Sequence, residues 1–329
     1  MAKSPSKDKL KEWEKTLVSI QTKHGDGIIM DMGKQVGKAF PCIPTGIWDV
    51  DNYVLGIGGI PKGRIVEVYG APGGGKSTLA LSLISSVQDV GGLCAYIDLE
   101  NALDPTWATL NGVDMNRLAV SQPDYGEQAL EIVDDIVRSE LADLIVVDSV
   151  AALVPKKELE GDMGDANVGL VARLMSQAMR KLTTISAKAG TTVLFINQTR
   201  DNIGVTYGSP TTTTGGKALK FYASVRLDVA RIASIEKGEE IVGNKVKIKA
   251  VKNRMAAPFR ETVVNLLFAE GFDKLGGLVT HGLAQGIFVK SGSWYSHGEE
   301  KIGQGFDSAR QYLATRPELQ EEIKTALSQ

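Results

Sequence analysis

The sequence predicts an α/β fold built around a mainly parallel sheet. Short apolar runs of strand length alternate with segments whose apolar residues recur at helical spacing, which is typical of a parallel sheet covered by helices. A glycine-rich loop at 70–78 lies between the first such strand and the first helix, and a later apolar strand ends at Asp148. The expected strands are 65–69, 93–98, 144–148 and 192–197, and the expected helices are 77–90, 127–140 and 169–188.

One amphipathic helix is expected near the start of the chain, over residues 5–24. Its apolar residues from Leu10 to Ile20 share one stripe among lysines and glutamates, and Gly25 follows as a stop signal. A short apolar segment at 28–30 comes next. This small unit either folds back on the main domain or docks on another subunit.

The second half of the chain departs from simple alternation. Two segments at 221–233 and 245–251 have strand character with no helix between them, so we expect a hairpin that extends the sheet. From about residue 273 glycines separate short elements, and a polar helix begins at Pro317. The expected parts are an N-terminal unit over 1–37, a core domain over 38–272 and a small C-terminal domain over 273–329.

The composition is that of an ordinary globular protein of 329 residues with a net charge of −2. No apolar run approaches the roughly 20 residues of a membrane span, and the lysine-rich N-terminus lacks the apolar segment of a secretory signal. The two cysteines and three histidines are scattered, so neither a disulfide framework nor a zinc site is expected. Any nucleic-acid binding must depend on local basic patches, because the whole chain is slightly acidic.

The loop at 70–78 fits the pattern G-x-x-x-x-G-K-[ST] of phosphate-binding loops, with a ligand-free glycine-rich turn as the alternative. Its glycines let backbone N–H groups surround a phosphate, and the following helix N-terminus adds partial positive charge. Lys76 would reach the β- and γ-phosphates, and the Ser77 hydroxyl would hold Mg²⁺. The expected nucleotide-binding residues are Gly70, Ala71, Pro72, Gly73, Gly74, Gly75, Lys76, Ser77 and Thr78.

Several of the expected strands end in polar side chains that suit ATP hydrolysis. Asp148 would be the second Mg²⁺ ligand, although it could instead cap the next helix. Glu100 is the candidate base for the attacking water, while Asp98 could be structural. Gln198 could sense the γ-phosphate or simply cap a loop. Trp107 could stack on adenine or pack in the core.

One long loop is a candidate DNA contact. The Gly/Thr-rich loop at 199–214 is long for a compact domain, and such loops are commonly functional or disordered. Its Arg200, Ile203 and Tyr207 offer a cation and apolar groups suited to backbone contact and base separation. A second loop at about 160–169 precedes a helix that carries two arginines, but the loop is itself acidic and by itself does not indicate DNA binding.

The strongest basic patch lies on the second strand of the expected hairpin. Strict alternation places Lys245, Lys247 and Lys249 on one face and apolar residues on the other. A row of lysines can bind a phosphate backbone, but lysines also protect edge strands from aggregation, and the residues alone favour the protective role. If the strand continues, Lys252 and Arg254 share the opposite face and are free for another role.

Over essentially its whole length the chain resembles the bacterial RecA recombinases. The resemblance depends on specific motifs and not on overall composition. These motifs are 64–70, 97–98 with Glu100, 102–105, 145–153, 175–182, 195–198, 212–216 and 218–227.

The resemblance implies a RecA-type P-loop ATPase core with two DNA-binding loops, at about 160–169 and 199–214. It also implies an N-terminal helix and strand that dock on the adjacent subunit, and a small α/β C-terminal domain that guides duplex DNA. It implies a cytoplasmic homologous recombinase that uses ATP and Mg²⁺, forms a helical filament on single-stranded DNA and pairs it with double-stranded DNA during repair. It also implies that the filament stimulates self-cleavage of a LexA-type repressor in the SOS response.

The resemblance further implies roles for individual residues. The catalytic residues are Lys76, Glu100, Gln198, Lys252 and Arg254, of which the last two reach ATP across the subunit interface. The metal ligands are Ser77 and Asp148, and the contacts to the nucleotide base are Asp104, Trp107 and Phe268. The DNA-binding residues are Arg173, Ser176, Arg180, Thr199, Arg200, Asp201, Ile203, Tyr207, Thr212, Gly215, Gly216, Lys217, Arg231, Lys245, Lys247 and Lys249.

The sequence departs from the family pattern at some of these positions. Pro72 replaces a usual Glu, Arg254 replaces a usual Lys, and the aromatic residue at Trp107 is more often Tyr. Arg and Lys donate hydrogen bonds in different geometries, so Arg254 could change the hydrolysis rate while still neutralising phosphate charge. Because the chain ends at Gln329 without the acidic tail of many members, we expect weaker restraint of duplex binding and less Mg²⁺ dependence.

Two other functions stay open. A hexameric, DNA-dependent motor ATPase of the same core fold would more often use an arginine finger and a different N-terminal domain. An ATP-gated scaffold would bind DNA without strand exchange, although Glu100 argues against it.

Overall fold

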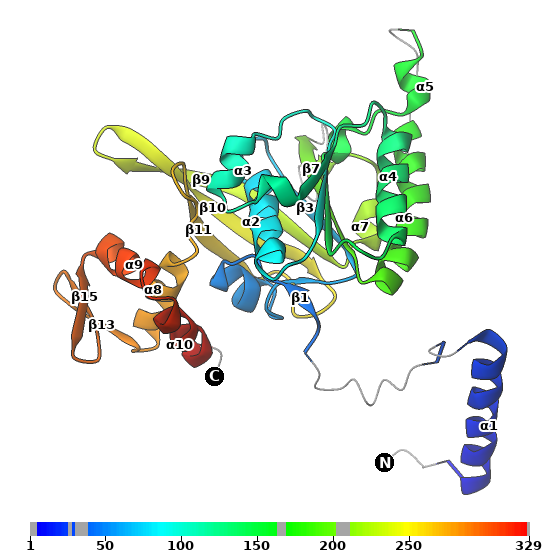
Figure 1. The fold of residues 1–329 in the computed structure, drawn as a ribbon, viewed down its shortest axis with the longest axis horizontal. Helices are drawn as coiled ribbons and strands as arrows, with labels where there is room; N and C mark the ends of the chain where they lie inside the picture. The colour runs from blue at the N-terminus through cyan, green and yellow to red at the C-terminus, as the bar shows by residue number, and fades with distance from the viewer. Residues whose placement is uncertain (1–4, 26–27, 30–38, 163–168, 202–210, 328–329) are drawn as a thin grey trace. The chain divides into compact units, whose positions relative to one another are not determined.

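The computed structural model describes residues 5–25, 28–29, 39–162, 169–201 and 211–327 (Figure 1). The chain divides into two compact units, Met1–Phe40 and Pro41–Gln329. The first unit contains the expected helix, α1 (Lys7–His24), which begins with a hydrogen bond from the Lys9 amide to the Ser6 hydroxyl. No side chain of α1 is buried. The strand implied after this helix falls largely outside the described residues.

The second unit is built on a ten-stranded sheet whose path is β12-β11-β10-β9-β3-β7-β6-β4-β5, with β8 paired to β7. From β3 to β5 the strands are parallel, so their carboxyl ends meet at one edge. These strands are β3 (Ile65–Gly70), β7 (Thr192–Asp201), β6 (Leu144–Asp148), β4 (Cys94–Asp98) and β5 (Leu118–Ser121). The four expected strands of this parallel group are confirmed, and β5, which is short and half-exposed, is the member of the group that was missed.

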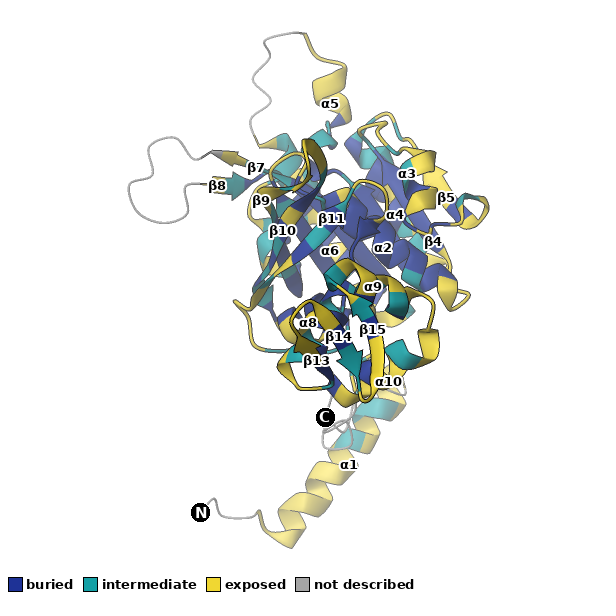
Figure 2. Cartoon of the chain, turned by 90° about the vertical axis from the view of Figure 1, so that its left-hand side faces the viewer, coloured by how far each residue is buried: buried dark blue, intermediate teal, exposed yellow. Residues whose placement is uncertain are grey.

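Helices cover both faces of the parallel strands, as expected for this fold class (Figure 1). α2 (Lys76–Asp89) packs on one face, and α4 (Gly126–Arg138) and α6 (Leu170–Ala189) pack on the other. Figure 2 shows α2 and the central strands as the buried interior. The shorter elements of the core are β1 (Cys42–Ile43), η2 (Asp49–Val54), β2 (Ile60–Pro61), α3 (Pro105–Leu110), η3 (Met115–Arg117), η4 (Val150–Ala152), α5 (Lys156–Leu159), β8 (Thr211–Thr213) and α7 (Ala218–Tyr222).

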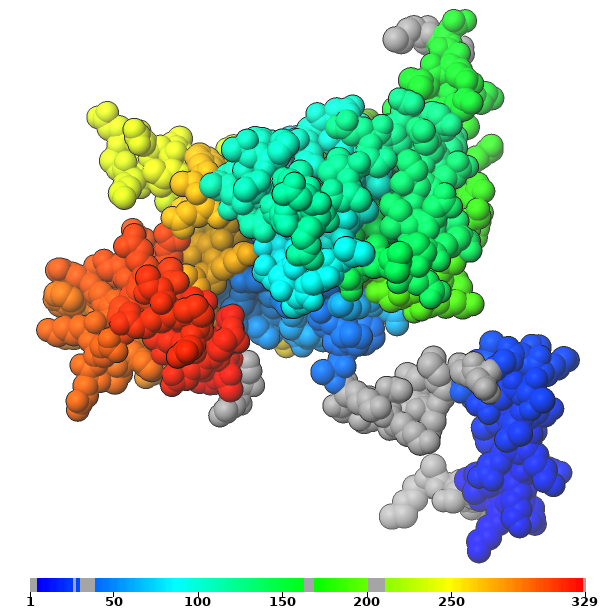
Figure 3. All heavy atoms as spheres, viewed as in Figure 1, coloured from blue at the N-terminus to red at the C-terminus, as the bar shows by residue number. Residues whose placement is uncertain are grey.

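The expected hairpin is present as β9 (Val225–Lys237) and β10 (Glu240–Asn253), and its tip projects from the second unit (Figure 3). The predicted strand 221–233 is wrong at its start, because 218–222 form α7. Leu219 and Ala223, four residues apart, are both buried in the core beneath α4 and α6, and this burial at helical spacing favours a helix. The sheet continues through β11 (Glu261–Leu267) and β12 (Gly271–Phe272).

The C-terminal part has its own apolar core and its own three-stranded antiparallel sheet. It consists of α8 (Gly276–Ala284), β13 (Phe288–Ser291), β14 (Trp294–His297), β15 (Glu300–Gln304), α9 (Phe306–Ala314) and α10 (Pro317–Leu327). Polar contacts join it to the core. Arg310 of α9 pairs with Glu270 at 2.7 Å and with Asp273 at 3.5 Å, and His281 of α8 contacts the Asp49 carboxylate.

Candidate nucleotide and DNA site

The predicted phosphate-binding loop lies between β3 and the N-terminus of α2, the context that the motif requires. Gly75 caps α2 at φ 95° without a side-chain hydrogen bond, so the first N–H groups of the helix remain available to a ligand. A Cβ at Gly75 would lie 3.2 Å from both Leu266 and Phe272, which leaves little room for a side chain. The loop therefore suits a phosphate group in both shape and donor chemistry.

Lys76 crosses this loop, where its Nζ donates a 2.8 Å hydrogen bond to the carbonyl of Ala71. Burial lowers the pKa of Lys76, and the carboxylates of Asp148 and Glu100 act in the opposite direction. The ammonium group is thus held by backbone within the loop and faces two acids, which is a suitable position for neutralising phosphate charge.

The two predicted metal ligands lie in direct contact. Ser77 Oγ donates to Asp148 Oδ2 at 2.8 Å, and the hydroxyl of Tyr96 donates to the same oxygen at 2.6 Å. Burial raises the pKa of Asp148, while these two hydrogen bonds lower it. Hydroxyl and carboxylate oxygens at one strand end form a ligand set that fits Mg²⁺.

Glu100 and Gln198 also meet, although they come from different strands. Gln198 Nε2 donates to Glu100 Oε1 at 2.8 Å, and Ser149 Oγ donates to the same oxygen. Glu100 follows β4, Ser149 follows β6 and Gln198 lies in β7, so the carboxyl ends of three adjacent strands meet here. Ser149 could not be predicted from the sequence, because its contact with Glu100 depends on the order of the strands.

A buried polar network anchors the strand that carries Gln198. Asn197 Nδ2 donates to Glu67 Oε1 at 2.9 Å and to the Thr214 carbonyl at 3.1 Å, and Thr214 Oγ1 donates to Asn197 Oδ1 at 2.5 Å. Glu67 is fully buried and pairs with Arg226. A charged residue inside the apolar run of β3 is the sequence signal that could have revealed this network, since buried charges need partners.

Asp98, which the sequence left open, has a structural role. Its carboxylate accepts hydrogen bonds from the amides of Ala102 and Leu103 at 3.1 and 3.2 Å and from Gln122 Nε2 at 3.1 Å. These contacts hold the chain that leaves β4 through Glu100. Asp98 therefore supports the position of Glu100 instead of competing with it as a base.

The three predicted base contacts lie on two segments, with Asp104 and Trp107 at the start of α3 and Phe268 directly after β11. Asp104 caps α3 by accepting from the Thr106 amide at 2.8 Å. Trp107 Nε1 donates to Thr78 Oγ1 at 3.3 Å, which places this ring beside the first turn of α2. Phe268, which follows β11, is half-exposed. Asp104 and Trp107 thus border the loop, and the strand that leads to Phe268 packs against Gly75 of the same loop through Leu266.

Part of the predicted DNA-binding set lies on one face of α6. Arg173, Ser176 and Arg180 are three and four residues apart, and both arginines are exposed. The segment that follows the long loop packs directly on this helix. A Cβ at Gly216 would lie 2.8 Å from the Cβ of Ala172, so a side chain there would disturb the contact.

The two ends of the long loop pair with each other, as the last residues of β7 and the short strand β8. Thr199 of β7 is opposite Thr213 of β8, and Arg200 is opposite Thr212. Thr212 Oγ1 accepts a 2.8 Å hydrogen bond from Lys220 of α7. The predicted contacts Ile203 and Tyr207, and residues 163–168 of the second loop, lie outside the described residues, as does the side chain of Asp201. Gly215 and Lys217 follow this paired segment, and Lys217 is exposed.

The lysine row lies on an interior strand. β10 pairs with β9 on one side and β11 on the other, so the edge-strand interpretation of Lys245, Lys247 and Lys249 is wrong. The predicted alternation is confirmed, because the intervening apolar side chains are buried. Lys249 pairs with Glu261 at 3.1 Å. Arg231 is opposite the buried Val246 and not opposite any of the three lysines.

Uninterrupted alternation predicted that Lys252 lies on the face of β10 opposite the lysine row, and this prediction is wrong. The pairing shifts between Ala250 and Lys252, so Lys252 is opposite Arg226 just as Lys249 is opposite Asp228. Arg226 and Asp228 are two residues apart and share a face, which places Lys252 on the side of the lysines.

Lys252 and Arg254 converge on α7. Lys252 Nζ donates to the carbonyl of Phe221 at 2.8 Å and to that of Lys220 at 2.9 Å, and Arg254 donates to the Phe221 carbonyl at 2.8 Å. Burial, followed by the positive charge of Arg254 and Arg226, lowers the pKa of Lys252 to about 8. The two cations are thus presented as a pair beside the end of a short helix.

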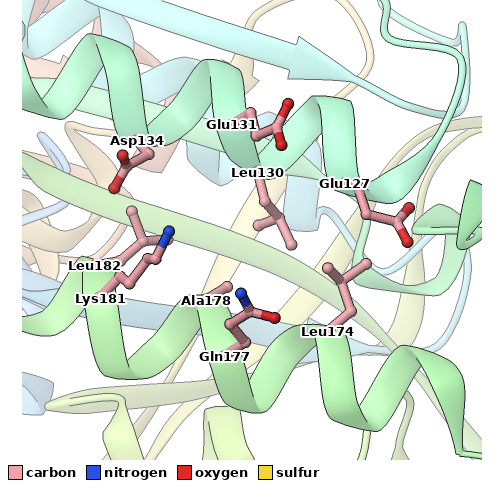
Figure 4. A pocket seen from close by; sticks show the side chains of 9 residues that line it. All are labelled: Glu127, Leu130, Glu131, Asp134, Leu174, Gln177, Ala178, Lys181 and Leu182. Atoms are coloured by element: carbon pink, nitrogen blue, oxygen red, sulfur yellow. The ribbon is translucent and has the colours of Figure 1, made fainter.

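A separate groove lies between α4 and α6 (Figure 4). Its floor is apolar, and α4 contributes three acidic side chains while α6 contributes Lys181. The groove is on the face of the sheet away from α2, and no predicted nucleotide-binding residue lines it. Its lining residues are Glu127, Leu130, Glu131, Asp134, Leu174, Gln177, Ala178, Lys181 and Leu182.

Comparison with known families assigns both parts of the chain. The RecA N-terminal domain model matches residues 11–273, and the RecA C-terminal domain model matches residues 276–329. The chain belongs to the RecA family. It is therefore a protein of DNA recombination and repair.

Curated relatives support this assignment along nearly the full length. Protein RecA of Thermus thermophilus is 54% identical over 318 residues, which cover 96% of this chain and 93% of the relative. Protein RecA of Rubrobacter xylanophilus is 51% identical over 316 residues, covering 96% and 92%. Protein RecA of Caulobacter vibrioides is 52% identical over 320 residues, covering 97% and 90%. In the described part of the chain, no helix is both long and apolar enough to cross a membrane.

Proposed function

We propose that this RecA-family chain is a single-stranded-DNA-dependent ATPase that works as a homologous recombinase in the cytoplasm. The observation that carries the proposal is the hydrogen bond between Gln198 and Glu100. It joins the candidate base for ATP hydrolysis to the strand that leads into the long loop at 199–214. A motor or a passive scaffold of the same fold gives no equally specific reason for this contact.

The residues around the phosphate-binding loop have different roles in ATP hydrolysis. The α2 N-terminus and Lys76 bind and orient the β- and γ-phosphates, and Ser77 with Asp148 holds the metal. Mg²⁺, when bound, supplies charge neutralisation at the phosphate oxygens. The Glu100 carboxylate accepts the proton of the attacking water, and Asp98 keeps the chain at Glu100 in place.

Gln198 couples this chemistry to DNA. Single-stranded DNA that contacts the segment 199–214 would shift the end of β7, and with it the amide that contacts Glu100 Oε1. Lys252 and Arg254 extend the site to the next subunit, where their positive charges would stabilise the transferred phosphoryl group of a neighbouring ATP. Assembly through the N-terminal unit 1–37 then produces a helical filament.

The DNA contacts are of the backbone type and carry no sequence preference. Arg173, Ser176 and Arg180 on α6, with the residues at the ends of the long loop, would hold the single strand. The row Lys245, Lys247 and Lys249 would attract a second, double-stranded DNA through its phosphates. Arg231, which is exposed on β9 but not opposite these lysines, would add a separate phosphate contact. The C-terminal domain would guide this duplex to the filament, and the filament would stimulate self-cleavage of a LexA-type repressor.

ATP hydrolysis measured with and without single-stranded DNA tests this function. We expect strong stimulation by DNA in the wild type, and its loss in Glu100→Gln while ATP-dependent DNA binding persists. Glu131→Gln, an acid in the α4–α6 groove, is the matched control and should behave as the wild type. Hydrolysis that is indifferent to DNA would favour the motor alternative. Absent hydrolysis with intact ATP-dependent DNA binding would favour the scaffold.

A further inference from the structure

Tyr96 is a buried tyrosine whose hydroxyl meets the nucleotide site, and the proposed mechanism has not used it. The residue is 2% exposed, and its side chain belongs to the apolar core shared with α2. The hydroxyl donates a 2.6 Å hydrogen bond to Asp148 Oδ2. A phenylalanine would fill the same core space without this contact, so packing alone does not account for the hydroxyl.

The position of Tyr96 follows from the sheet. β4 and β6 are adjacent and parallel, with Tyr96 opposite Val146 and Asp98 opposite Asp148. Asp148 is therefore two residues further toward the carboxyl edge, about 7 Å along the strand. The long side chain of Tyr96 leans along the strand, so its hydroxyl can span this distance and reach the Asp148 carboxylate from the core.

Two hydroxyl groups thus fix the same carboxylate oxygen. Asp148 Oδ2 accepts from Tyr96 at 2.6 Å and from Ser77 at 2.8 Å, while no hydrogen bond from the described residues reaches Oδ1. Two donors at Oδ2 restrict rotation of the carboxylate and leave Oδ1 facing away from them. Mg²⁺ needs near-ideal octahedral geometry, so the direction of each oxygen ligand matters for its binding.

We propose that Tyr96 is a positioning residue that orients the Asp148 carboxylate for Mg²⁺ bound with nucleotide. Outer partners of metal ligands typically change metal affinity by about 10–100-fold when they are removed. The proposal rests on the nucleotide site described above and adds a residue to it. It concerns orientation through a hydrogen bond and assigns Tyr96 no contact with the nucleotide.

The test is the Mg²⁺ dependence of nucleotide binding by Tyr96→Phe in the full chain. Binding of a fluorescent, non-hydrolysable ATP analogue is followed as Mg²⁺ is titrated. We expect the half-saturating Mg²⁺ concentration to rise by roughly tenfold, while binding of the analogue in the presence of a chelator is unchanged. Tyr295→Phe, which alters a tyrosine 5% exposed in the C-terminal part, is the control and should match the wild type.

A double-mutant cycle with Asp148→Asn separates positioning from packing. If Tyr96 acts through the carboxylate, Tyr96→Phe causes no further change in the Asp148→Asn background, whereas independent effects would add. Equal Mg²⁺ requirements in the wild type and Tyr96→Phe, or additive effects in the cycle, would overturn the role of Tyr96 alone. A wild type that does not bind the analogue at any Mg²⁺ concentration would overturn this role together with the proposed ATP site.

Discussion

Glu100 receives hydrogen bonds from Ser149 and Gln198, and both reach its Oε1. The other carboxylate oxygen is then the one left to face an attacking water. The same arrangement recurs at Asp148, where two hydroxyls occupy Oδ2. At both acids, the donors that orient the carboxylate come from other elements: from the ends of β6 and β7 at Glu100, and from β4 and α2 at Asp148.

At the residue scale, Lys252 gives a prediction about pH. Its pKa is lowered to about 8, so the charged form that can neutralise a neighbouring ATP is present below this pH and is lost above it. Because phosphate binding favours the charged form, assembly near this pH takes up a proton. We expect ATP-dependent assembly on single-stranded DNA to weaken as the pH rises through about 8.

Fluorescence anisotropy of a labelled oligonucleotide measures this assembly. Lys252→Arg should keep assembly at high pH, since arginine stays charged. Lys157→Arg, on the short helix α5, is the control and should follow the wild type. Parallel loss of assembly in Lys252→Arg and the wild type would exclude Lys252 as the titrating group.

At the scale of elements, α6 and β7 hold the two ends of the candidate DNA surface. Gly216 at φ 78° lies against Ala172 of α6, and β8 pairs with β7 next to Gln198. The spacing of Arg173, Ser176 and Arg180 on α6 therefore has a fixed relation to the end of β7. Contacts to DNA on α6 and movement at Gln198 are linked through backbone packing and not only through the loop.

Gly216→Ala tests this link. The substitution forces an L-residue into left-handed backbone, at a cost of about 1–2 kcal/mol, and brings a Cβ within 2.8 Å of Ala172. We expect weaker binding of single-stranded DNA and less stimulation of ATP hydrolysis. Gly190→Ala is the matched control, because Gly190 has φ 74° and nothing within 4 Å of the place that a Cβ would occupy, so it carries only the backbone cost. Equal effects of both substitutions on DNA binding would contradict the link.

Some parts of the site are marked by local sequence patterns, and others depend on how the elements are arranged. Lys76, Ser77 and Asp148 were predictable, because a loop motif or a strand end marks each of them. The contacts of Tyr96 and Ser149 depend on β4, β6 and β7 being neighbours, which no local pattern specifies. The face of Lys252 depends on a shift in pairing between β9 and β10, and uninterrupted alternation cannot predict such a shift.

At the scale of the whole molecule, the C-terminal part joins the core through few, charged contacts. Arg310 is largely buried and pairs with both Glu270 and the buried Asp273. His281 lies beside Trp48, with ring centroids 4.8 Å apart and the rings tilted by 46°, and it contacts Asp49. The sequence predicted a separate C-terminal domain from its change in composition, but it gave no sign of these partners, which are far away along the chain.

Arg310→Gln should weaken this junction. Removing the guanidinium leaves Asp273 buried with only its backbone donors, and a loss of about 1–3 kcal/mol in the free energy of unfolding is expected. Urea unfolding measures the loss, and limited proteolysis near residues 273–276 should accelerate. Arg316→Gln breaks an exposed pair with Glu300 at 3.6 Å and should change stability little. Identical unfolding curves for Arg310→Gln and the wild type would contradict this account of the junction.

The most direct test of the central claim compares ATP hydrolysis with and without single-stranded DNA in the wild type and in Gln198→Ala. The claim is that Gln198 carries the DNA signal from β7 to Glu100. We predict that Gln198→Ala keeps the hydrolysis rate measured without DNA but loses most of the stimulation by DNA, while still binding the strand. Full stimulation by DNA in Gln198→Ala would show that the two sites communicate by another route.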